Sequence, residues 1–333
     1  MPDVHLTSPI LIAGYGSAGR RHFRNLRALG HSNFVFLRSG AGVLDDCEIA
    51  DFPSTRSLEA ALRFGPQIVV VATPSSQHLD IALAAAEAGC DLYIEKPLGH
   101  ELENAGRLLA AVRERKLIAM IGCQFRFHPM LTELRAMIAR GQLGSIAGAS
   151  AAYGEYLPDW HPWEDHRKSY SARRELGGGA ILTLSHPLDY LYALFGEWRR
   201  IQALVRRVSF LDTPAGEDWS DINVEFANGV VAHAHVDYVQ RPPIHQLSVV
   251  GDRGRAICDF NAGELRCWVG EGETIVRRTP DGFDRNTMFR DAVRHFLACV
   301  KERSEPQIPL ADGVAVLKMA LEARCVASEK LDA

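Results

Sequence analysis

The chain has 333 residues, of which 47% are hydrophobic and 23% charged, and its formal net charge at pH 7 is -4. This composition is typical of a globular protein with two domains, and it argues against a disordered chain, a general nucleic-acid binder and a membrane binder. The 7 cysteines form no Cys-x-x-Cys pair and no apolar run approaches the length of a membrane span, so we expect a cytoplasmic protein with reduced thiols.

The first predicted strand leads into a glycine-rich turn. An apolar run over residues 9–13 is followed by Gly14, Gly16 and Gly19, and then by apolar residues at helical spacing. In a dinucleotide-binding turn the first glycine permits the tight bend, the second lets a pyrophosphate approach the backbone, and the third lets the helix pack close to the strand. The N–H groups at the start of that helix attract phosphates. We therefore expect a cofactor to be bound here by Gly14, Tyr15, Gly16, Ser17, Ala18 and Gly19.

The second predicted strand, residues 34–37, is followed by Arg38 and Ser39. An acidic residue at this place binds the 2′-hydroxyl of the NAD ribose, whereas a guanidinium cannot accept the hydrogen bonds of a ribose diol. Arginine pairs well with a 2′-phosphate, and the neighbouring hydroxyl adds a donor. The pattern favours NADP over NAD. The alternative is a solvated surface arginine in an NAD enzyme.

Two further strands are predicted to end at the same edge of a parallel sheet. The β-branched strand over residues 67–72 leads to Thr73 and Pro74, which border the cofactor or form a capping turn for the next helix, residues 77–88. The strand over residues 91–94 then brings three more residues to this edge. We expect the cofactor to contact Thr73, Pro74, His78, Glu95, Lys96 and Pro97.

A strand over residues 117–123 is predicted to close the first part of the chain. We therefore expect a dinucleotide-binding Rossmann domain at 1–123 and an α+β domain for substrate binding and oligomerisation at 124–333. The second domain should begin with a helix and continue as a mostly antiparallel open sheet. Its predicted elements are a helix at 130–140, strands at 201–208, 222–226, 230–239, 245–250 and 256–260, and two amphipathic helices at 286–302 and 311–328, which pack on the sheet or against the first domain.

A segment ahead of the predicted sheet combines aromatic faces with basic donors, which suit a sugar ring or a phosphorylated substrate and equally suit packing between domains. Within it we assign substrate binding to Tyr156, Trp163 and Arg167. His233 and His235 share one face of a predicted strand, but no third ligand at suitable spacing accompanies them, so we expect no metal site.

The helix predicted over residues 180–195 carries three polar residues, Thr183, His186 and Asp189, roughly on one face. His186 is suited to bind or protonate a substrate oxygen, with Asp189 orienting its ring or binding another hydroxyl. Pro187 lacks an N–H, so the helix should be interrupted there and restart near this residue.

The ordered set of motifs resembles the glucose-fructose oxidoreductase, inositol dehydrogenase and rhizopine-catabolism (Gfo/Idh/MocA) family. The resemblance rests on the glycine turn, the Ala-Thr-Pro strand end at 72–74 and Glu-Lys-Pro at 95–97. It continues in Phe-Arg-Phe-His-Pro at 125–129 and in the stretch from the glycine triplet at 177–179 to Asp189, so it covers nearly the full chain.

The resemblance implies an NAD(P)-dependent oxidoreductase that acts on a sugar or sugar derivative and assembles as a homo-oligomer, a dimer or a tetramer. It also implies that the lysine of the family's EKP motif is Lys96 and that its catalytic histidine is His186. The family usually has an aspartate four residues before this histidine, where the chain has Leu182, so a second carboxylate is not carried over. Arg126 is expected to meet the nicotinamide or substrate, or to anchor a carboxylate.

The chemistry of hydride transfer gives Lys96 a role. The nicotinamide carries the hydride, so the protein positions the reacting carbon and manages the hydroxyl proton. Free lysine has a pKa of about 10.4, and desolvation and an oxidised nicotinamide both favour its neutral, basic form. We therefore expect hydride transfer between nicotinamide and a hydroxyl or carbonyl carbon of a small sugar, cyclitol or nucleotide-sugar-like substrate. The alternatives are a non-catalytic dinucleotide-dependent sensor, or a hydrolase or epimerase that retains its cofactor.

Overall fold

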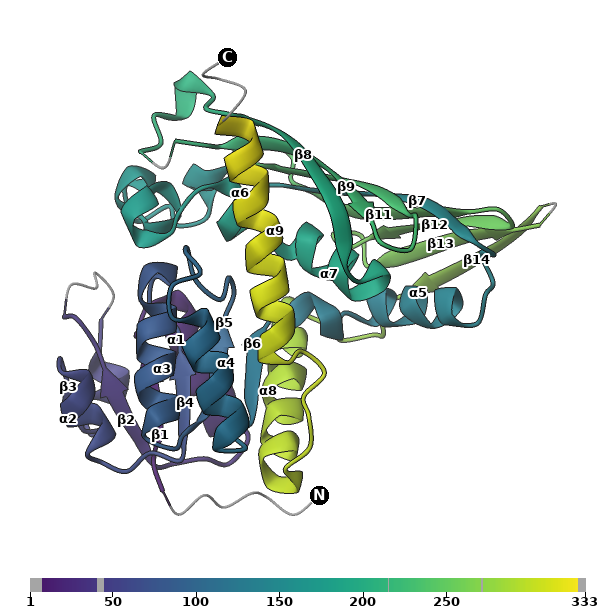
Figure 1. Ribbon diagram of the computed structural model, residues 1–333. Coiled ribbons are helices and arrows are strands. Elements are labelled where there is room, and N and C mark those ends of the chain that lie inside the picture. Colours follow the sequence, from purple (N-terminus) through teal and green to yellow (C-terminus); the bar gives the residue numbers. More distant parts are fainter. Residues whose placement is uncertain (1–7, 41–44, 215, 271, 329–333) are drawn as a thin grey trace. The chain divides into compact units, whose positions relative to one another are not determined.

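The computed structural model describes residues 8–40, 45–214, 216–270 and 272–328, which fall into two compact units. Unit 1 joins the chain up to Cys123 with Arg285–Val314, and unit 2 joins Gln124–Asp284 with the chain from Ala315. Each unit contains one sheet (Figure 1). In the part of the chain that the structure describes, no helix combines the length and the apolar character needed to cross a membrane.

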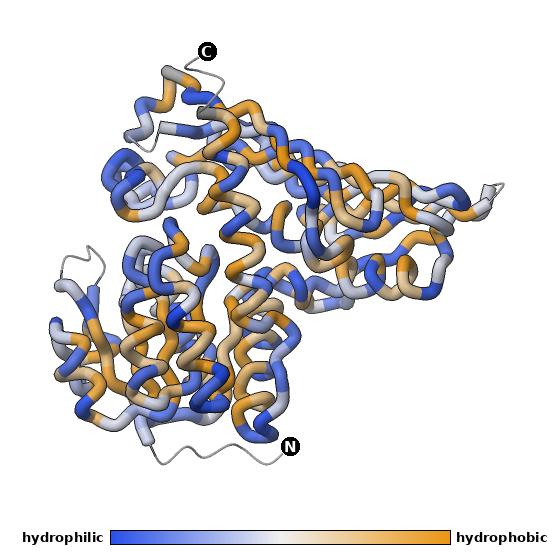
Figure 2. The backbone as a smooth tube through the Cα atoms, in the orientation of Figure 1, coloured by the Kyte–Doolittle hydropathy of each residue, from blue (hydrophilic) through white to orange (hydrophobic). Residues whose placement is uncertain are grey.

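Unit 1 is built on a parallel sheet with the strand order β3-β2-β1-β4-β5-β6. Except for the short edge strand β3, every residue of these strands is buried, as expected when helices cover both faces, and Figure 2 shows them as largely hydrophobic. The order and direction confirm the predicted Rossmann domain. The strands are β1 (Ile10–Ala13), β2 (Phe34–Leu37), β3 (Ser54–Thr55), β4 (Ile68–Val71), β5 (Asp91–Glu95) and β6 (Ala119–Gly122).

The helices of unit 1 pack in neighbouring pairs, with α1 against α8 and α3 against α4. Their apolar stripes face the sheet, because a half-buried helix places its hydrophobic residues on one side. The helices are α1 (Ser17–Ala28), α2 (Leu58–Leu62), α3 (His78–Glu87), α4 (Ala105–Glu114) and α8 (Arg285–Glu302).

Helix α8 packs with unit 1, one of the two placements that the sequence leaves open for it. The division falls after Cys123, where the sequence places it, but Arg285–Val314 packs with the first unit instead of the second. Phe289 of α8 lies against the ring of His22, with a centroid distance of 6.2 Å, and Phe296 lies 5.6 Å from Tyr93. The amphipathic pattern predicts the helix, but it does not say which sheet the helix covers.

Unit 2 contains an eight-stranded sheet with the order β14-β13-β12-β11-β7-β10-β9-β8. Every neighbouring pair is antiparallel except β7 and β10, so the predicted mostly antiparallel α+β domain is confirmed. The strands are β7 (Ile146–Gly154), β8 (Trp198–Arg206), β9 (Trp219–Phe226), β10 (Val231–Asp237), β11 (Ile244–Gly251), β12 (Gly254–Asp259), β13 (Glu264–Val269) and β14 (Glu273–Arg278).

One helical stretch of unit 2 is interrupted near Pro187, as the sequence predicts. The helical stretch breaks after Thr183 and restarts at His186, with the proline in the first turn, where its missing N–H costs nothing. The helices are α5 (Pro129–Ala139), α6 (Ala180–Thr183) and α7 (His186–Phe195), while α9 (Leu310–Ser328) begins in unit 1 and continues in unit 2. Short 3-10 turns lie at Cys47–Ile49, Ser75–Gln77, Gln124–Phe127, Leu157–Asp159, His166–Lys168, Tyr170–Ala172, Arg174–Leu176 and Ser209–Leu211.

Candidate active site

The three glycines between β1 and α1 have the steric environments that a dinucleotide turn requires. Gly14 has φ +93°, and a Cβ there would lie 2.5 Å from the carbonyl oxygen of Ala72. A Cβ on Gly16 would meet no atom within 4 Å, while a Cβ on Gly19 would overlap the carbonyl oxygen of Gly14. No side chain caps the start of α1 at Gly16. The backbone is therefore bare where a pyrophosphate approaches and crowded where helix meets strand, which fits a bound dinucleotide.

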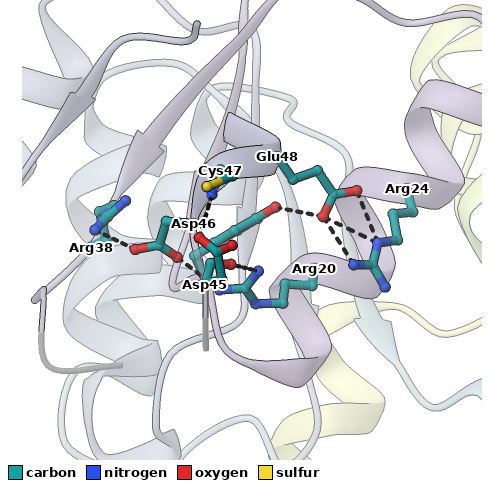
Figure 3. A network of polar contacts seen from close by, with 8 residues as sticks. Arg20, Arg24, Arg38, Asp45, Asp46, Cys47 and Glu48 are labelled. Atoms are coloured by element: carbon teal, nitrogen blue, oxygen red, sulfur yellow. Dashed lines mark hydrogen bonds and ion pairs between the residues drawn. The ribbon is translucent and has the colours of Figure 1, made fainter. Parts of the chain in front are cut away.

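The residue after β2 is an arginine that already has an acidic partner. Arg38 forms an ion pair with Asp46, and Asp46 also binds Arg20 of α1 at 2.7 Å (Figure 3). The guanidinium of Arg20 lies 4.3 Å from the centre of the Tyr15 ring, and the Tyr15 hydroxyl donates to Glu48 at 3.1 Å. Burial and Glu48 raise the pKa of Tyr15 to about 12, so this phenol stays neutral at physiological pH.

Lys96 follows a glutamate that is held from two sides. Glu95, at the end of β5, contacts Nε2 of His22 on α1 at 2.5 Å and accepts the N–H of Lys96 at 3.2 Å. Burial raises the pKa of Glu95, but the His22 hydrogen bond and the nearby positive charges outweigh it, and the pKa lies below its ordinary value. The buried carboxylate therefore stays charged and ties the start of the EKP turn to the helix of the glycine turn, while the Lys96 side chain is half-buried.

His78 joins the two other turns at this edge of the sheet. Its Nδ1 lies 2.8 Å from the carbonyl oxygen of Pro97, and its Nε2 lies 2.8 Å from that of Thr73. Burial lowers the pKa of His78, so the neutral ring donates to one carbonyl at a time. The structure gives this ring a role in holding the turns, and its direct contact with a cofactor stays a prediction.

In unit 2, His186 lies buried at the start of α7 among aromatic rings. The Gln124 amide lies 3.2 Å from Nε2 of His186, so when it donates to that atom the neutral imidazole carries its proton on Nδ1. The Phe125 ring lies 4.7 Å from the His186 ring, and His245 of β11 stacks on Tyr153 of β7 at 4.0 Å. The arrangement provides a histidine held by an amide and surrounded by aromatic rings, which suits proton transfer.

Arg126 and Asp189 bind each other. Nε of Arg126 donates to both carboxylate oxygens at 3.1 and 3.0 Å, and Nη2 donates to Oδ1 at 2.7 Å. Only 5% of the arginine side chain and 2% of the aspartate side chain are exposed. Of the two predicted uses of Arg126, the structure therefore shows the carboxylate anchor, while contact of either residue with cofactor or substrate stays a prediction.

The other residues predicted to bind substrate, Tyr156, Trp163 and Arg167, have different surroundings from one another. Trp163 is 60% exposed, which is unusual for so large an aromatic side chain. Arg167 is exposed and pairs with Asp165, and the ring of Tyr156 lies under the guanidinium of Arg241 at 3.6 Å. Among the described residues, no cluster of three or more His, Cys, Asp or Glu side chains is suited to hold a metal ion.

Comparison with known proteins places the chain in a family. Residues 9–123 match the oxidoreductase family with an NAD-binding Rossmann fold, and residues 131–257 match the GFO/IDH/MocA C-terminal domain. The chain belongs to the GFO/IDH/MocA family. The resemblance drawn from the sequence motifs is thereby confirmed, as is the assignment to the oxidoreductases.

The names of similar curated proteins describe enzymes that act on sugars and cyclitols. The chain is 30% identical to levoglucosan dehydrogenase of Pseudarthrobacter phenanthrenivorans over 47% of this chain, a match that spans less than half (44%) of that enzyme. It is 25% identical to 1,5-anhydro-D-fructose reductase of Ensifer adhaerens, over 76% of this chain and 77% of that one. It is also 25% identical to scyllo-inositol 2-dehydrogenase (NAD(+)) of Bacillus subtilis, over 78% of this chain and 75% of that enzyme.

Solved GFO/IDH/MocA structures share the fold of the whole chain. Levoglucosan dehydrogenase in complex with NADH and levoglucosan has a TM-score of 0.84 at 19% identity, covering 97% of this chain and 98% of that one. UDP-N-acetylglucosamine 3-dehydrogenase from Acidithiobacillus ferrooxidans has a TM-score of 0.79 at 22% identity, covering 98% of this chain and 99% of that one. At these identities the likeness establishes the fold.

Sequence reasoning missed several residues that the structure places in or beside the candidate site. His22 lies three residues after Gly19, but the glycine pattern assigns no role to this position, so the sequence does not predict its contact with Glu95. Gln124 and His245 lie in separate elements and become neighbours of the His186 region only through the fold. The one sequence signal for His245 is its position at the start of the strand predicted over residues 245–250.

Proposed function

We propose that the protein is an NAD(P)-dependent dehydrogenase or reductase that transfers a hydride between nicotinamide and a hydroxyl or carbonyl carbon of a sugar, cyclitol or nucleotide-sugar-like substrate. The observation that carries the proposal is the glycine turn, which is open at Gly16 and closed at Gly14 and Gly19. The names of the curated relatives support the class of substrate.

The proposed chemistry divides between the cofactor and the protein. The nicotinamide, when bound, accepts or gives the hydride. Lys96 takes the hydroxyl proton in the oxidative direction and returns it in the reductive one, and the buried Glu95 holds the backbone of the turn in place. His186, oriented by Gln124, binds or protonates a substrate oxygen. Asp189, anchored by Arg126, fixes the helix that carries His186.

For the cofactor we propose NADP, with NAD as the alternative. Arg38 and Ser39 follow β2, where an acid would bind the ribose of NAD, and a guanidinium suits a 2′-phosphate. For the substrate we propose that the exposed Trp163 offers a flat apolar face to a sugar ring, and that Arg167 and Tyr156 contribute polar contacts. A cytoplasmic homo-oligomer, a dimer or a tetramer, completes the proposal.

Substitution of Lys96 tests the chemical assignment. We expect Lys96→Met to lower kcat by about a thousandfold, because general acid–base groups contribute roughly 10²–10⁴, while the dissociation constant of the cofactor changes little. His186→Ala should lower kcat similarly. Lys301→Met, at the exposed end of α8, is the matched control and should keep the wild-type rate.

The assay follows nicotinamide absorbance with a panel of sugars, cyclitols and nucleotide sugars, and calorimetry measures cofactor binding. Turnover of Lys96→Met at the wild-type rate would remove the lysine from the mechanism. A wild-type protein that binds neither NAD nor NADP would overturn the proposed function itself.

A further inference from the structure

The carboxyl ends of two neighbouring strands in unit 1 both lead into arginines. Strands β2 and β3 run parallel, and the N–H of Arg38, after β2, donates to the carbonyl oxygen of Thr55 at 3.0 Å. Arg56 comes next after β3, and its guanidinium lies so close to Gly40 that a Cβ there would be 2.6 Å from its Nη2. Arg20 reaches the same region from α1, so three positive side chains lie near the end of β2.

Asp46 is the carboxylate that joins two of these arginines. Its Oδ1 accepts from Arg20 at 2.7 Å, and its Oδ2 pairs with Arg38 (Figure 3). The neighbouring acids are engaged elsewhere. Asp45 accepts the N–H of Cys47 at 2.9 Å through its side chain, and Glu48 is bound by Arg24 and by the Tyr15 hydroxyl. Asp46 is thus placed as the counter-ion of the arginine that follows β2.

The ion pair between Arg38 and Asp46 is open to water. The exposed fraction is 28% for the Arg38 side chain and 33% for the Asp46 side chain. Partly exposed pairs of this kind contribute little net free energy, about 0–1 kcal/mol, so a stronger anion displaces the carboxylate readily. A phosphate monoester carries about -1.5 to -2 charge at pH 7 and three acceptor oxygens, which makes it such an anion.

We propose that Asp46 sets the preference between NAD and NADP by acting as an internal competitor for the 2′-phosphate. In NADP that phosphate displaces Asp46 from Arg38 and is also close to Arg56. In NAD no such anion is present, and the Arg38–Asp46 pair stays intact. Asp46 therefore holds down the affinity for NADP and leaves the affinity for NAD nearly unchanged. This inference rests on the proposed function, because it requires that the glycine turn binds a dinucleotide.

The test is a calorimetric comparison of cofactor affinities, without turnover. Dissociation constants for NAD and NADP are measured for the wild type, Asp46→Asn and the double variant Asp46→Asn/Arg38→Gln. The fragment probes 5′-AMP and adenosine 2′,5′-bisphosphate repeat the comparison without the nicotinamide end. Glu48→Gln is the matched control. It also removes one carboxylate of this network, but that carboxylate is bound by Arg24 and Tyr15 and not by Arg38. Thermal unfolding checks that every variant is folded.

We expect Asp46→Asn to tighten binding of NADP and of the 2′,5′-bisphosphate by about tenfold, the size expected for removing one like charge at short range. NAD and 5′-AMP should change by less than about threefold. The double variant should lose the gain, and Glu48→Gln should keep the wild-type ratio of the two affinities.

Three results would overturn the inference. The first is an unchanged NADP-to-NAD ratio in a folded Asp46→Asn protein. The second is weaker binding of NAD to that variant with NADP unchanged, which would make Asp46 a ribose ligand instead of a competitor. The third is a Glu48→Gln effect as large as that of Asp46→Asn. Failure of the wild type to bind either dinucleotide would instead refute the proposed function.

Discussion

Gly16 and Gly19 lie three residues apart in one turn, yet their surroundings assign them opposite roles. The position at Gly16 is open, and its φ of -78° is accessible to alanine. We expect Gly16→Ala to fold normally but to weaken dinucleotide binding by about tenfold, or ~1.4 kcal/mol, because its methyl group occupies the space beside the backbone where the pyrophosphate lies.

Gly19→Ala should show the reverse order of effects. Its Cβ would overlap the carbonyl oxygen of Gly14, so helix and strand must separate, which costs about 1–3 kcal/mol of stability. Denaturant unfolding and cofactor titration of both variants measure the two effects. A Gly19→Ala protein as stable as the wild type, or a Gly16→Ala protein with unchanged cofactor affinity, would contradict the glycine assignments.

At the level of single residues, the sequence predicts what is local. The glycine turn, the Arg38 position and the EKP turn follow from short motifs, because adjacent residues on one turn meet the same ligand. The Arg126–Asp189 pair joins residues 63 positions apart, and no spacing rule connects them. The same holds for the contact between His22 and Glu95.

Strand β10 carries a histidine, His235, that links stability to pH. His235 contacts Asp221 at 2.8 Å through Nδ1 and Asp237 at 2.9 Å through Nε2. Burial lowers the pKa of His235, but the hydrogen bonds to Asp237 and Asp221 outweigh it, and the pKa is raised. The stabilisation is therefore complete below the ordinary histidine value of about 6.5 and is lost as the pH rises through the raised pKa.

We expect His235→Gln to lower Tm more at pH 5.5 than at pH 9, by a difference on the order of 2 °C. Differential scanning calorimetry across this pH range measures the effect. Asp221→Asn removes one of the two carboxylates that His235 contacts, so it should also make Tm depend less on pH than in the wild type. An equal loss of Tm at both pH values would show that the ring stabilises the strands only by packing.

The predictability of the elements followed their composition. Strands β1, β2 and β4 are rich in Ile, Val and Phe, and the predicted ranges match them within a residue or two, because β-branched and aromatic runs mark buried parallel strands. The sequence does not predict the two-residue strand β3. The sequence does not predict strand β7, because the residues between Ile146 and Tyr153 are all Ala, Gly or Ser, which have low strand propensity. Its place at the centre of the sheet comes from the partners on either side.

For the whole molecule, the return of α8 to unit 1 predicts that residues 1–123 do not fold alone. Without Arg285–Val314, the fragment exposes the surfaces that Phe289 and Phe296 cover and leaves Asp91 without its ion pair to Arg303 at 2.7 Å. We expect the isolated fragment to show no cooperative unfolding, and a linked chain of 1–123 with 285–314 to regain it, as followed by circular dichroism. Cooperative unfolding of the fragment alone would refute this.

The backbone passes from unit 1 to unit 2 after Cys123, returns at Arg285 and leaves again after Val314. During synthesis at about 5–20 residues per second, the nucleotide-binding unit therefore waits on the order of ten to forty seconds for its last helix. A chain whose synthesis stops within residues 124–284 lacks Arg285–Val314, so the surfaces of unit 1 that this segment covers stay exposed. Premature termination would thus yield a substrate for proteolysis instead of a half-enzyme that sequesters dinucleotide.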